Sequence, residues 1–375
     1  MEPWNVEICD VTLRDGEQTP GVSFTCEEKA AIATLLDKTG IEVIEAGFPA
    51  VSAYELQCVR AVTSLDLEAR ICCLARAKQG DIDAAIAAEV DMVSIFIATS
   101  DLHVRLKYRR PRAEVLDEAL RMVDYARDHG LSVRFAAEDA SRTETAFLHE
   151  MYRRGAEHGA HLVSFADTVG CLVPLEMHRV MSQLVSESRV PLCAHCHNDL
   201  GCATANTLTA AQAGAFQLHT TVNGIGERAG NARLEEVLVG LFHKGGVDRY
   251  RLDHLPALSA LVAECSGIPV GKTHPVVGEH AFAHESGIHI AALLQDPNTY
   301  EYVHPAEIGA ERRFVLGKHS GRRALEHVVC SLGCRLDDRQ ISRVLELVKE
   351  RGEHQKCTVT PEVLMDLIRR VRGEG

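Results

Sequence analysis

Short apolar runs alternate with longer stretches of helical periodicity from residue 6 to about residue 241. This alternation indicates parallel strands connected by helices, because each parallel strand needs a crossover before the next one. Eight strand–helix units follow one another, which is the number in a (β/α)8 barrel. We therefore predict an α/β protein built on a TIM barrel, with strands near residues 6–11, 41–46, 69–74, 92–97, 132–137, 162–165, 191–196 and 217–221.

The alternation ends after about residue 242, and the rest of the chain has a different pattern. Residues 252–266 are predicted to be helical, a segment rich in Gly, Pro and His follows, and the final part returns to amphipathic helix. We expect three parts, namely a catalytic barrel domain over 1–268, a lid-like linker over 269–321 and a small helical C-terminal subdomain over 322–375.

Two of the predicted helices begin with a capping box, in which a Ser or Thr and a Glu three residues later cap each other's backbone N–H groups. The boxes are Thr25–Glu28 and Ser141–Glu144. Each follows a strand and a polar cluster. The polar residues therefore fall in the loops at the carboxyl ends of the strands, where TIM-barrel enzymes have their active sites.

The composition is that of a folded globular protein, with 46% hydrophobic and 25% charged residues. The formal charge of −13 argues against a nucleic-acid partner, which requires a basic face. The basic run at 105–112 is the exception, and it is either an exposed loop or a phosphate contact. No apolar run reaches about 18 residues and no apolar leader follows Met1, so we expect no membrane contact and a cytoplasmic location.

The chain has 13 cysteines, an odd number scattered through apolar, strand-like segments such as residues 71–74. A disulfide framework is typical of short secreted chains with regular cysteine spacing, which this chain lacks. We expect these cysteines to be buried free thiols in a reducing cytosol.

Residues 10–18 place three acids and an arginine at the end of the first predicted strand, where a polar cluster is costly unless it binds something. His195 and His197 alternate along the seventh strand, so they point to the same face. With Asp15 they predict a three-ligand site for a divalent metal, and Zn, Mn, Co and Mg all suit such ligands. The same ligands could hold Fe(II), usually on a different scaffold. Isolated histidines are expected to be structural, among them His219, His243 and His254.

Polar residues also follow other strands. We expect substrate contacts from Arg14 and Gln18 after the first strand, from Arg76 after the third and from Thr168 after the sixth. The glycine-rich loop at 223–231 follows the last strand, and we expect it to be mobile and to approach a ligand closely.

Arg134 and Glu138 alternate along the fifth predicted strand, so both face the barrel interior if one does. A buried arginine requires a carboxylate partner. Either Glu138 neutralises Arg134, or a carboxylate of the substrate does.

Five motifs follow one another along the chain, D-x-T-L-R-D-G-E-Q-x-P-G at 10–21, H-C-H-N-D-x-G at 195–201, V-N-G-I-G-E-R-A-G-N at 222–231, F-A-H-E-S-G-I-H at 282–289 and L-G-K-H-S-G at 316–321. Together they resemble the acyl-CoA-condensing metal enzymes, a family of homocitrate, isopropylmalate and citramalate synthases. The resemblance covers nearly the whole chain. It points to the homocitrate synthases that serve nitrogen fixation or a methanogen coenzyme.

The resemblance implies a Claisen condensation of acetyl-CoA with a 2-oxo acid that chelates a divalent metal. By position, Asp15, His195 and His197 match the family's metal ligands, and Asn231 lies close to the same centre. Arg14 matches an arginine that stabilises developing oxyanion charge.

Other matching residues imply further roles. Thr168 matches a threonine that holds the carboxylate of the 2-oxo acid, and Glu138 matches an acid that assists proton transfer. His289 and Tyr300 match catalytic residues on a lid that each subunit of a homodimer donates to its partner's barrel. We therefore expect a homodimer. Arg134 matches an arginine that pairs with the distal carboxylate of 2-oxoglutarate, which favours homocitrate synthesis.

Three alternatives stay open. Isopropylmalate and citramalate synthases usually have an additional regulatory domain, for which the residues after 321 leave no room. Acyl-CoA lyases of related type have a reactive cysteine in the glycine-rich loop after the last strand, and residues 223–231 contain none. An inactive sensor or scaffold would not need the full set of site residues.

Overall fold

The structure, a computed structural model, describes residues 2–355 and 358–373. These residues divide into two compact units, residues 1–270 and 271–375. No helix in the described part of the chain is long and apolar enough to cross a membrane. The predicted subdivision of the second unit at residue 321 stays a prediction.

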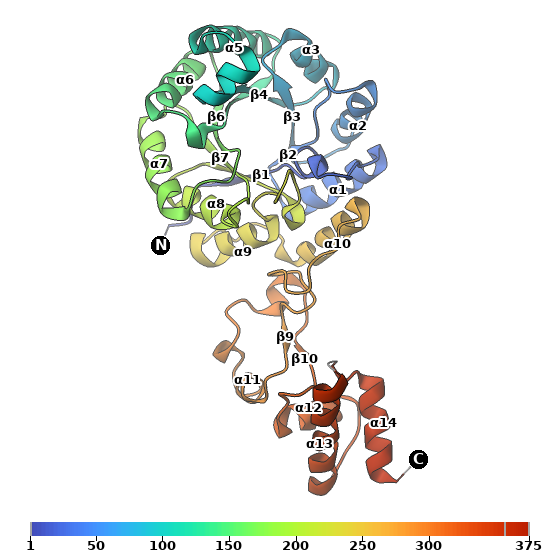
Figure 1. Cartoon of the computed structure of the whole chain (residues 1–375). Coiled ribbons are helices and arrows are strands. Elements are labelled where there is room, and N and C mark those ends of the chain that lie inside the picture. Colours follow the sequence, from blue (N-terminus) through green and yellow to red (C-terminus); the bar gives the residue numbers. More distant parts are fainter. Residues whose placement is uncertain (1, 356–357, 374–375) are drawn as a thin grey trace. The chain divides into compact units, whose positions relative to one another are not determined.

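The first unit is a closed barrel of eight parallel strands, which confirms the predicted TIM barrel (Figure 1). The barrel closes where the first strand pairs with the last, from Glu7 opposite Gln217 to Asp10 opposite Thr220. The strands are β1 (Glu7–Asp10), β2 (Val43–Glu45), β3 (Arg70–Arg76), β4 (Met92–Ala98), β5 (Ser132–Glu138), β6 (Leu162–Asp167), β7 (Leu192–Cys196) and β8 (Gln217–Thr220).

A helix follows each strand and covers the outside of the barrel (Figure 1). These helices bury apolar residues against the strands; Leu116, Leu120 and Val123 on α5, for example, are fully or almost fully buried. The helices of this unit are α1 (Cys26–Thr39), α2 (Ala53–Thr63), α3 (Gln79–Ala87), the short α4 (Asp101–His103), α5 (Arg112–Asp128), α6 (Thr145–Glu157), α7 (Pro174–Glu187), α8 (Ala203–Gln212), α9 (Leu234–Gly245) and α10 (Leu255–Ser266).

One predicted capping box is confirmed and the other is wrong. The Thr25 hydroxyl accepts from the Glu28 N–H at 3.1 Å, and the Glu28 carboxylate accepts from the Thr25 N–H at 2.7 Å. Ser141 instead lies in a separate 3-10 turn, Ala140–Arg142, and α6 begins at Thr145. The preceding Asp139 has a left-handed backbone with φ of 63° and its carboxylate binds the Arg142 guanidinium, so these residues form a turn of their own.

A buried lysine connects the first two strand–helix loops. Lys29 on α1 is completely buried, and its ammonium contacts Glu17 at 2.7 Å and Glu55 at 2.8 Å. The same ammonium donates to the carbonyl oxygens of Leu13 and Ala46 at 3.1 and 3.2 Å. Since three of these partners lie in the loops after β1 and β2, Lys29 fixes the backbone on which the first-strand site residues stand.

The prediction that the cysteines are free thiols is wrong for two of them. Cys26, the first residue of α1, forms a disulfide with Cys58 on α2, because the packing of these helices brings the two Cα atoms to 4.4 Å. The other ten described cysteines are free, and Cys9, Cys72 and Cys193 among them are buried inside the barrel.

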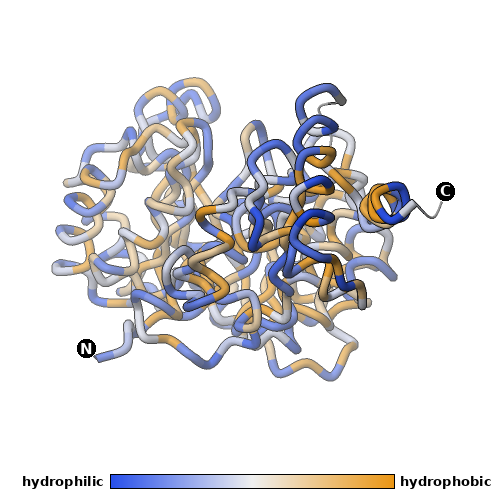
Figure 2. Tube along the Cα trace, turned by 90° about the horizontal axis from the view of Figure 1, so that it is seen from below, coloured by the Kyte–Doolittle hydropathy of each residue, from blue (hydrophilic) through white to orange (hydrophobic). Residues whose placement is uncertain are grey.

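The second unit combines a two-stranded parallel sheet with helices. Its strands are β9 (Ala283–His284) and β10 (Arg313–Phe314), and its helices are α11 (Gly287–Leu293), α12 (Arg322–Ser331), α13 (Asp338–Gln355) and α14 (Pro361–Arg372). The helices pack around an apolar cluster that includes Leu325, Val344, Val348 and Leu364. In Figure 2, α14 beside the C-terminal label has hydrophobic residues on one side and hydrophilic residues on the other.

Candidate active site

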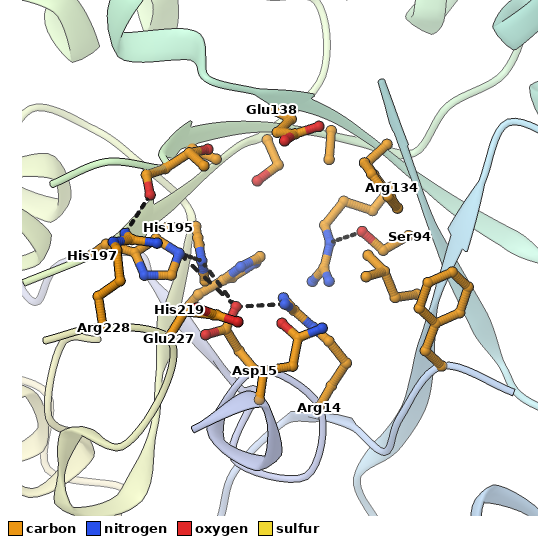
Figure 3. A pocket seen from close by; sticks show the side chains of 18 of the residues that line it. Arg14, Asp15, Ser94, Arg134, Glu138, His195, His197, His219, Glu227 and Arg228 are labelled. Atoms are coloured by element: carbon orange, nitrogen blue, oxygen red, sulfur yellow. Dashed lines mark hydrogen bonds and ion pairs between the residues drawn. The ribbon is translucent and has the colours of Figure 1, made fainter. Parts of the chain in front are cut away.

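A cavity of about 350 Å³ opens at the carboxyl ends of the barrel strands (Figure 3). Residues from β1, β5, β6, β7 and β8 or the loops after them contribute to its wall, as the alternation along the strands predicts. Of the residues predicted from the sequence, those that line it are Arg14, Asp15, Gln18, Arg134, Glu138, Thr168, His195 and His197.

Asp15, His195 and His197 bring three ligand atoms together on one side of the cavity (Figure 3). His195 Nε2 lies 3.1 Å from His197 Nε2 and 3.6 Å from Asp15 Oδ2, and His197 Nε2 lies 4.0 Å from the same oxygen. A point about 2.1 Å from all three atoms exists, and that distance is the usual length of metal bonds to imidazole and carboxylate. The geometry of these side chains therefore fits one divalent metal.

The protonation states of the three side chains also suit metal ligands. Burial lowers the pKa of His195 well below its usual value, and the neighbouring His197 lowers it further. Burial likewise lowers the pKa of His197. Burial alone would raise the pKa of Asp15, but Arg14 and the two histidines outweigh it and hold that pKa well below the usual range. Neutral imidazoles and an ionised carboxylate are the forms that bind metals.

Asn231 lies beside this triangle. Its side-chain amide donates to Asp15 Oδ1 at 2.7 Å, and its buried Oδ1 has no hydrogen-bond partner among the described residues. Gly226 has a φ of 152°, and a Cβ there would lie 2.1 Å from the Asn231 amide nitrogen. Only glycine allows the loop to pass this close to the three ligands.

Glu45 at the end of β2 is the carboxylate that neutralises Arg134, which corrects the prediction of Glu138 or a substrate in that role. Glu45 Oε2 accepts from Arg134, and Glu45 Oε1 accepts from Arg14. All three side chains are buried or nearly so. The β2 strand faces β5 across the barrel interior, so the partner comes from a strand that sequence order does not place beside Arg134.

Arg134 is held by further contacts inside the barrel. It donates to Ser94 Oγ at 3.1 Å, to Gln217 Oε1 at 2.7 Å and to Cys9 Sγ at 3.2 Å, in addition to Glu45. A guanidinium has five N–H donors, so these four contacts leave one N–H without a described partner.

Glu138 lies on the opposite side of the cavity from Asp15 (Figure 3). Its Oε1 pairs with Lys107 and lies 3.5 Å from His103 Nδ1, while its buried Oε2 has no hydrogen-bond partner in the described part of the chain. Lys107 therefore fixes one oxygen, and the other is buried without a hydrogen-bond partner among the described residues.

The glycine-rich loop after β8 contributes Glu227 and Arg228 to the cavity wall (Figure 3). Arg228 binds both oxygens of Asp199 at 2.7 and 2.9 Å and donates to the Thr168 carbonyl at 2.7 Å. The Thr168 hydroxyl accepts from the Asp139 N–H at 2.9 Å, which leaves its own hydrogen free for a ligand. The loop thus contacts two neighbouring strand ends, and its mobility stays a prediction.

Four predicted site residues do not line this cavity: Asn231, which lies behind Asp15, and three others. Arg76 forms a bidentate pair with Asp81 at 2.8 and 2.9 Å and lines a neighbouring cavity instead. His289 and Tyr300 belong to the second unit, where their rings stack with centroids 4.0 Å apart. Their roles at the active site stay predictions.

Two residues that sequence reasoning did not assign to the site also line the cavity. His219, expected to be structural, lines the cavity with its ring 5.4 Å from the His195 ring. The sequence contained one indication of this position. His219 alternates with Gln217 along β8, so both side chains face the barrel interior. Lys107 comes from the basic run, and nothing in that run singled it out as the partner of Glu138.

The chain is similar to two families of known sequence. Residues 5–262 match the HMGL-like family, and residues 276–356 match the family described as homocitrate synthase post-HMGL domain-like. Among curated relatives, homocitrate synthase AksA of Methanosarcina acetivorans is 51% identical over 99% of this chain and 92% of its own length. The 2-isopropylmalate synthase of Methanocaldococcus jannaschii is 44% identical over 96% of this chain and 71% of its own length.

The fold is also similar to solved structures at low sequence identity. The hydroxymethylglutaryl-CoA lyase of Pseudomonas aeruginosa matches 72% of this chain and 96% of its own length, with a TM-score of 0.65 and 22% identity. At that identity the likeness establishes the shared barrel alone.

Proposed function

The chain belongs to the HMGL-like family and is an enzyme of its homocitrate synthase-type, acyl-CoA-condensing branch, and from this premise we propose that it condenses acetyl-CoA with 2-oxoglutarate to give homocitrate and CoA. The observation that carries the proposal is the Asp15–His195–His197 triangle next to Arg14, in a cavity that also contains Arg134. In the overall reaction the acetyl methyl group loses a proton, its carbon bonds to the keto carbon, and water releases CoA from the thioester.

A divalent metal bound by the triangle would polarise the keto oxygen of the 2-oxo acid as a Lewis acid, and Zn, Mn, Co or Mg could serve. Arg14, held by Asp15 and Glu45, stabilises the negative charge that develops on oxygen as the new carbon–carbon bond forms. Thr168 donates its hydroxyl to the carboxylate of the 2-oxo acid, and Gln18 contributes an amide to the same wall.

Glu138 assists proton transfer in this proposal. The Glu138 side chain lines the cavity on the side opposite the triangle, where the acetyl methyl group would approach, and its buried Oε2 has no described partner. Lys107 holds the other oxygen in place. In this proposal a partner subunit of a homodimer supplies His289 and Tyr300, the residues that match the family's lid. Both side chains are exposed in their own unit, and their rings stack on each other. A cytoplasmic location also stays part of the proposal.

The choice of 2-oxo acid rests on two observations. The relatives named homocitrate synthase are 51%, 50% and 48% identical to this chain. The free N–H of Arg134 offers one hydrogen bond to a distal carboxylate, which an aliphatic 2-oxo acid lacks. Against these stand the apolar wall residues Leu74 and Phe96, and relatives named 2-isopropylmalate and citramalate synthases at 43–49% identity.

Thiol release from acetyl-CoA tests the proposal. The purified chain is assayed with a divalent metal and, side by side, 2-oxoglutarate, 2-oxoisovalerate, pyruvate and oxaloacetate. Preference for 2-oxoglutarate supports homocitrate synthesis. Preference for 2-oxoisovalerate or pyruvate instead makes the chain an isopropylmalate or citramalate synthase. If none of the four 2-oxo acids supports thiol release and the chain instead cleaves a hydroxyacyl-CoA, the chain is a lyase.

The metal assignment has its own test. His195→Ala removes one ligand, so metal content after dialysis and thiol release should fall together. The exposed His178→Ala serves as the matched control and should keep both. A His195→Ala variant that is fully active and fully loaded with metal would contradict the assignment.

A further inference from the structure

His103 lies beside Glu138 but outside the wall of the active-site cavity. It is the last residue of α4, and its side chain is only 20% exposed. Its ring nitrogen Nδ1 lies 3.5 Å from Glu138 Oε1, and its other ring nitrogen, Nε2, lies 3.7 Å from Asp139 Oδ2. One imidazole therefore stands between the carboxylates of two consecutive residues.

The backbone of Asp139 allows both carboxylates to face the same ring. Consecutive residues of a strand point their side chains to opposite faces. Asp139 follows the last residue of β5 and has a left-handed backbone with φ of 63° and ψ of 36°, which interrupts this alternation. A left-handed backbone at a residue other than glycine costs free energy, and such residues cluster at active sites.

Contacts outside the active-site cavity hold the Asp139 side of the ring. The Asp139 carboxylate is completely buried and accepts from the Arg142 guanidinium at 2.8 and 2.9 Å and from the Ser100 hydroxyl. Ser100 Oγ also accepts from the backbone N–H of His103 at 3.2 Å. The ring is therefore fixed to the ends of both β4 and β5.

These contacts also assign the hydrogen of the ring. Arg142 Nη2 lies 3.4 Å from His103 Nε2, and a guanidinium can only donate, so Nε2 of a neutral ring accepts. The hydrogen of the neutral ring then lies on Nδ1, and a protonated ring has a hydrogen there as well. In both forms an N–H group of His103 is adjacent to Glu138 Oε1.

The Glu138 side of the ring lacks its hydrogen bond. His103 Nδ1 and Glu138 Oε2 are both buried, and neither has a hydrogen-bond partner among the described residues. Buried polar atoms without partners cost free energy and are rare in native proteins. A shift of about 0.5 Å would bring Nδ1 and Oε1 to an ordinary hydrogen-bond distance. Hydrogen bonds of catalytic groups are often long until the substrate binds.

Lys107 contacts the same oxygen but does not set the direction of the carboxylate. Its ammonium pairs with Glu138 Oε1, while its side chain is 46% exposed. An ammonium on a flexible stem supplies charge and little orientation. The His103 ring is rigid and held from its far side, so it can fix the plane of the Glu138 carboxylate.

We propose that His103 is a positioning residue for Glu138. Its Nδ1–H donates to Glu138 Oε1 when the substrates are bound and holds the carboxylate in the orientation from which it assists proton transfer. The proposal rests on the proposed function, in which the acetyl methyl group loses a proton with the help of Glu138. His103 acts through Glu138 alone, since it does not line the cavity.

Two replacements separate the two ends of the ring. The amide nitrogen of asparagine reaches about as far as Nδ1 of histidine, and that of glutamine reaches about as far as Nε2. His103→Asn therefore keeps a donor towards Glu138, whereas His103→Gln keeps one towards Asp139. His103→Ala removes both donors, and the exposed His178→Ala is the matched control.

For each protein we would measure metal content, the KM of both substrates and kcat, using acetyl-CoA with an ordinary or a deuterated methyl group. Loss of the hydrogen bond should lower kcat about tenfold in His103→Ala and His103→Gln, with metal content and both KM values unchanged. Because only cleavage of the methyl C–H bond slows, the deuterium isotope effect on kcat should be larger in these two variants than in the parent chain. His103→Asn should recover most of kcat, and His178→Ala should match the parent chain.

A kcat of His103→Ala within twofold of that of the parent chain would overturn the proposal. Equal losses in His103→Asn and His103→Gln with an unchanged isotope effect would also overturn it, because a structural role alone gives that result. Failure of the proposed function is recognised separately, by a parent chain that condenses no 2-oxo acid. If such a chain still exchanges the methyl hydrogens of acetyl-CoA with heavy water, slower exchange in His103→Ala supports the positioning role and overturns the proposed function alone. A chain without condensation or exchange would overturn both.

Discussion

Replacement of Lys29 is the sharpest test of how the barrel holds its active-site loops. Lys29→Met keeps the length of the side chain but removes the charge that lies between Glu17 and Glu55. Two unit charges about 4 Å apart attract each other by about 4 kcal/mol at an effective dielectric constant of about 20. Breaking a buried pair from one side costs about 3–5 kcal/mol in practice. Because the two carboxylates keep 19% and 15% exposure and can be partly rehydrated, we expect the lower end, about 3 kcal/mol.

Thermal unfolding measures this loss. A cost of about 3 kcal/mol corresponds to a fall in Tm of about 6–12 °C for a unit of this size. Trp4 is the only tryptophan of the chain, and its backbone N–H donates to the Gly245 carbonyl of α9 at 2.8 Å. Its fluorescence therefore reports the unfolding of the barrel unit.

Two further variants make the result decisive. The exposed Lys38→Met on the same helix should change Tm by no more than about 2 °C, because surface substitutions cost within about 0.5 kcal/mol. Adding Glu17→Gln and Glu55→Gln to Lys29→Met should recover part of the loss, since no carboxylate is then left without its cation. A Lys29→Met Tm equal to that of Lys38→Met would refute the reasoning.

Three other predictions follow from buried groups. Glu45→Gln should lower the unfolding free energy by about 3–5 kcal/mol, because buried Arg134 loses its counter-ion; an unchanged urea midpoint would contradict this. Burial raises the pKa of Asp10 to about 7, so the free energy of unfolding should fall as the pH rises from about 4 towards 7. The unfolding free energy of Asp10→Asn minus that of the parent chain should therefore be larger at pH 8 than at pH 5. An equal difference at the two pH values would contradict this prediction. Denatured, unreduced protein should show two thiols fewer than reduced protein, and Cys26→Ser should abolish disulfide formation at Cys58; equal counts would exclude the disulfide.

Much of the barrel could be predicted because its signals are local. Apolar runs of strand length alternate with helical segments, and each side chain at a strand end is placed by its own strand. This is why Asp15, His195 and His197 were identifiable as one site although 180 residues separate the first from the second. Parallel strands put their carboxyl ends at the same face whatever lies between them.

The predictions that proved wrong concern residues whose contacts cross the barrel, join two helices or form a local turn. The pairing of Glu45 with Arg134 joins two strands that are not neighbours, and no periodicity records which inward residues meet inside a closed sheet. The Cys26–Cys58 disulfide depends on how α1 packs on α2. The capping box at Ser141 had the right residues, but the left-handed turn at Asp139 ended the local run before the helix could begin there.

The single carboxylate between Arg14 and Arg134 also constrains how substrate preference can evolve in this family. In the proposed reaction Arg14 stabilises developing charge and Arg134 faces the distal end of the substrate, and both guanidinium groups pair with Glu45. A lineage that replaces Arg134 to accept an aliphatic acid leaves Glu45 with Arg14 alone and so alters the charge around its own catalytic arginine. A change of substrate through Arg134 therefore requires compensating substitutions around Glu45. We expect such substitutions to occur together rather than one at a time.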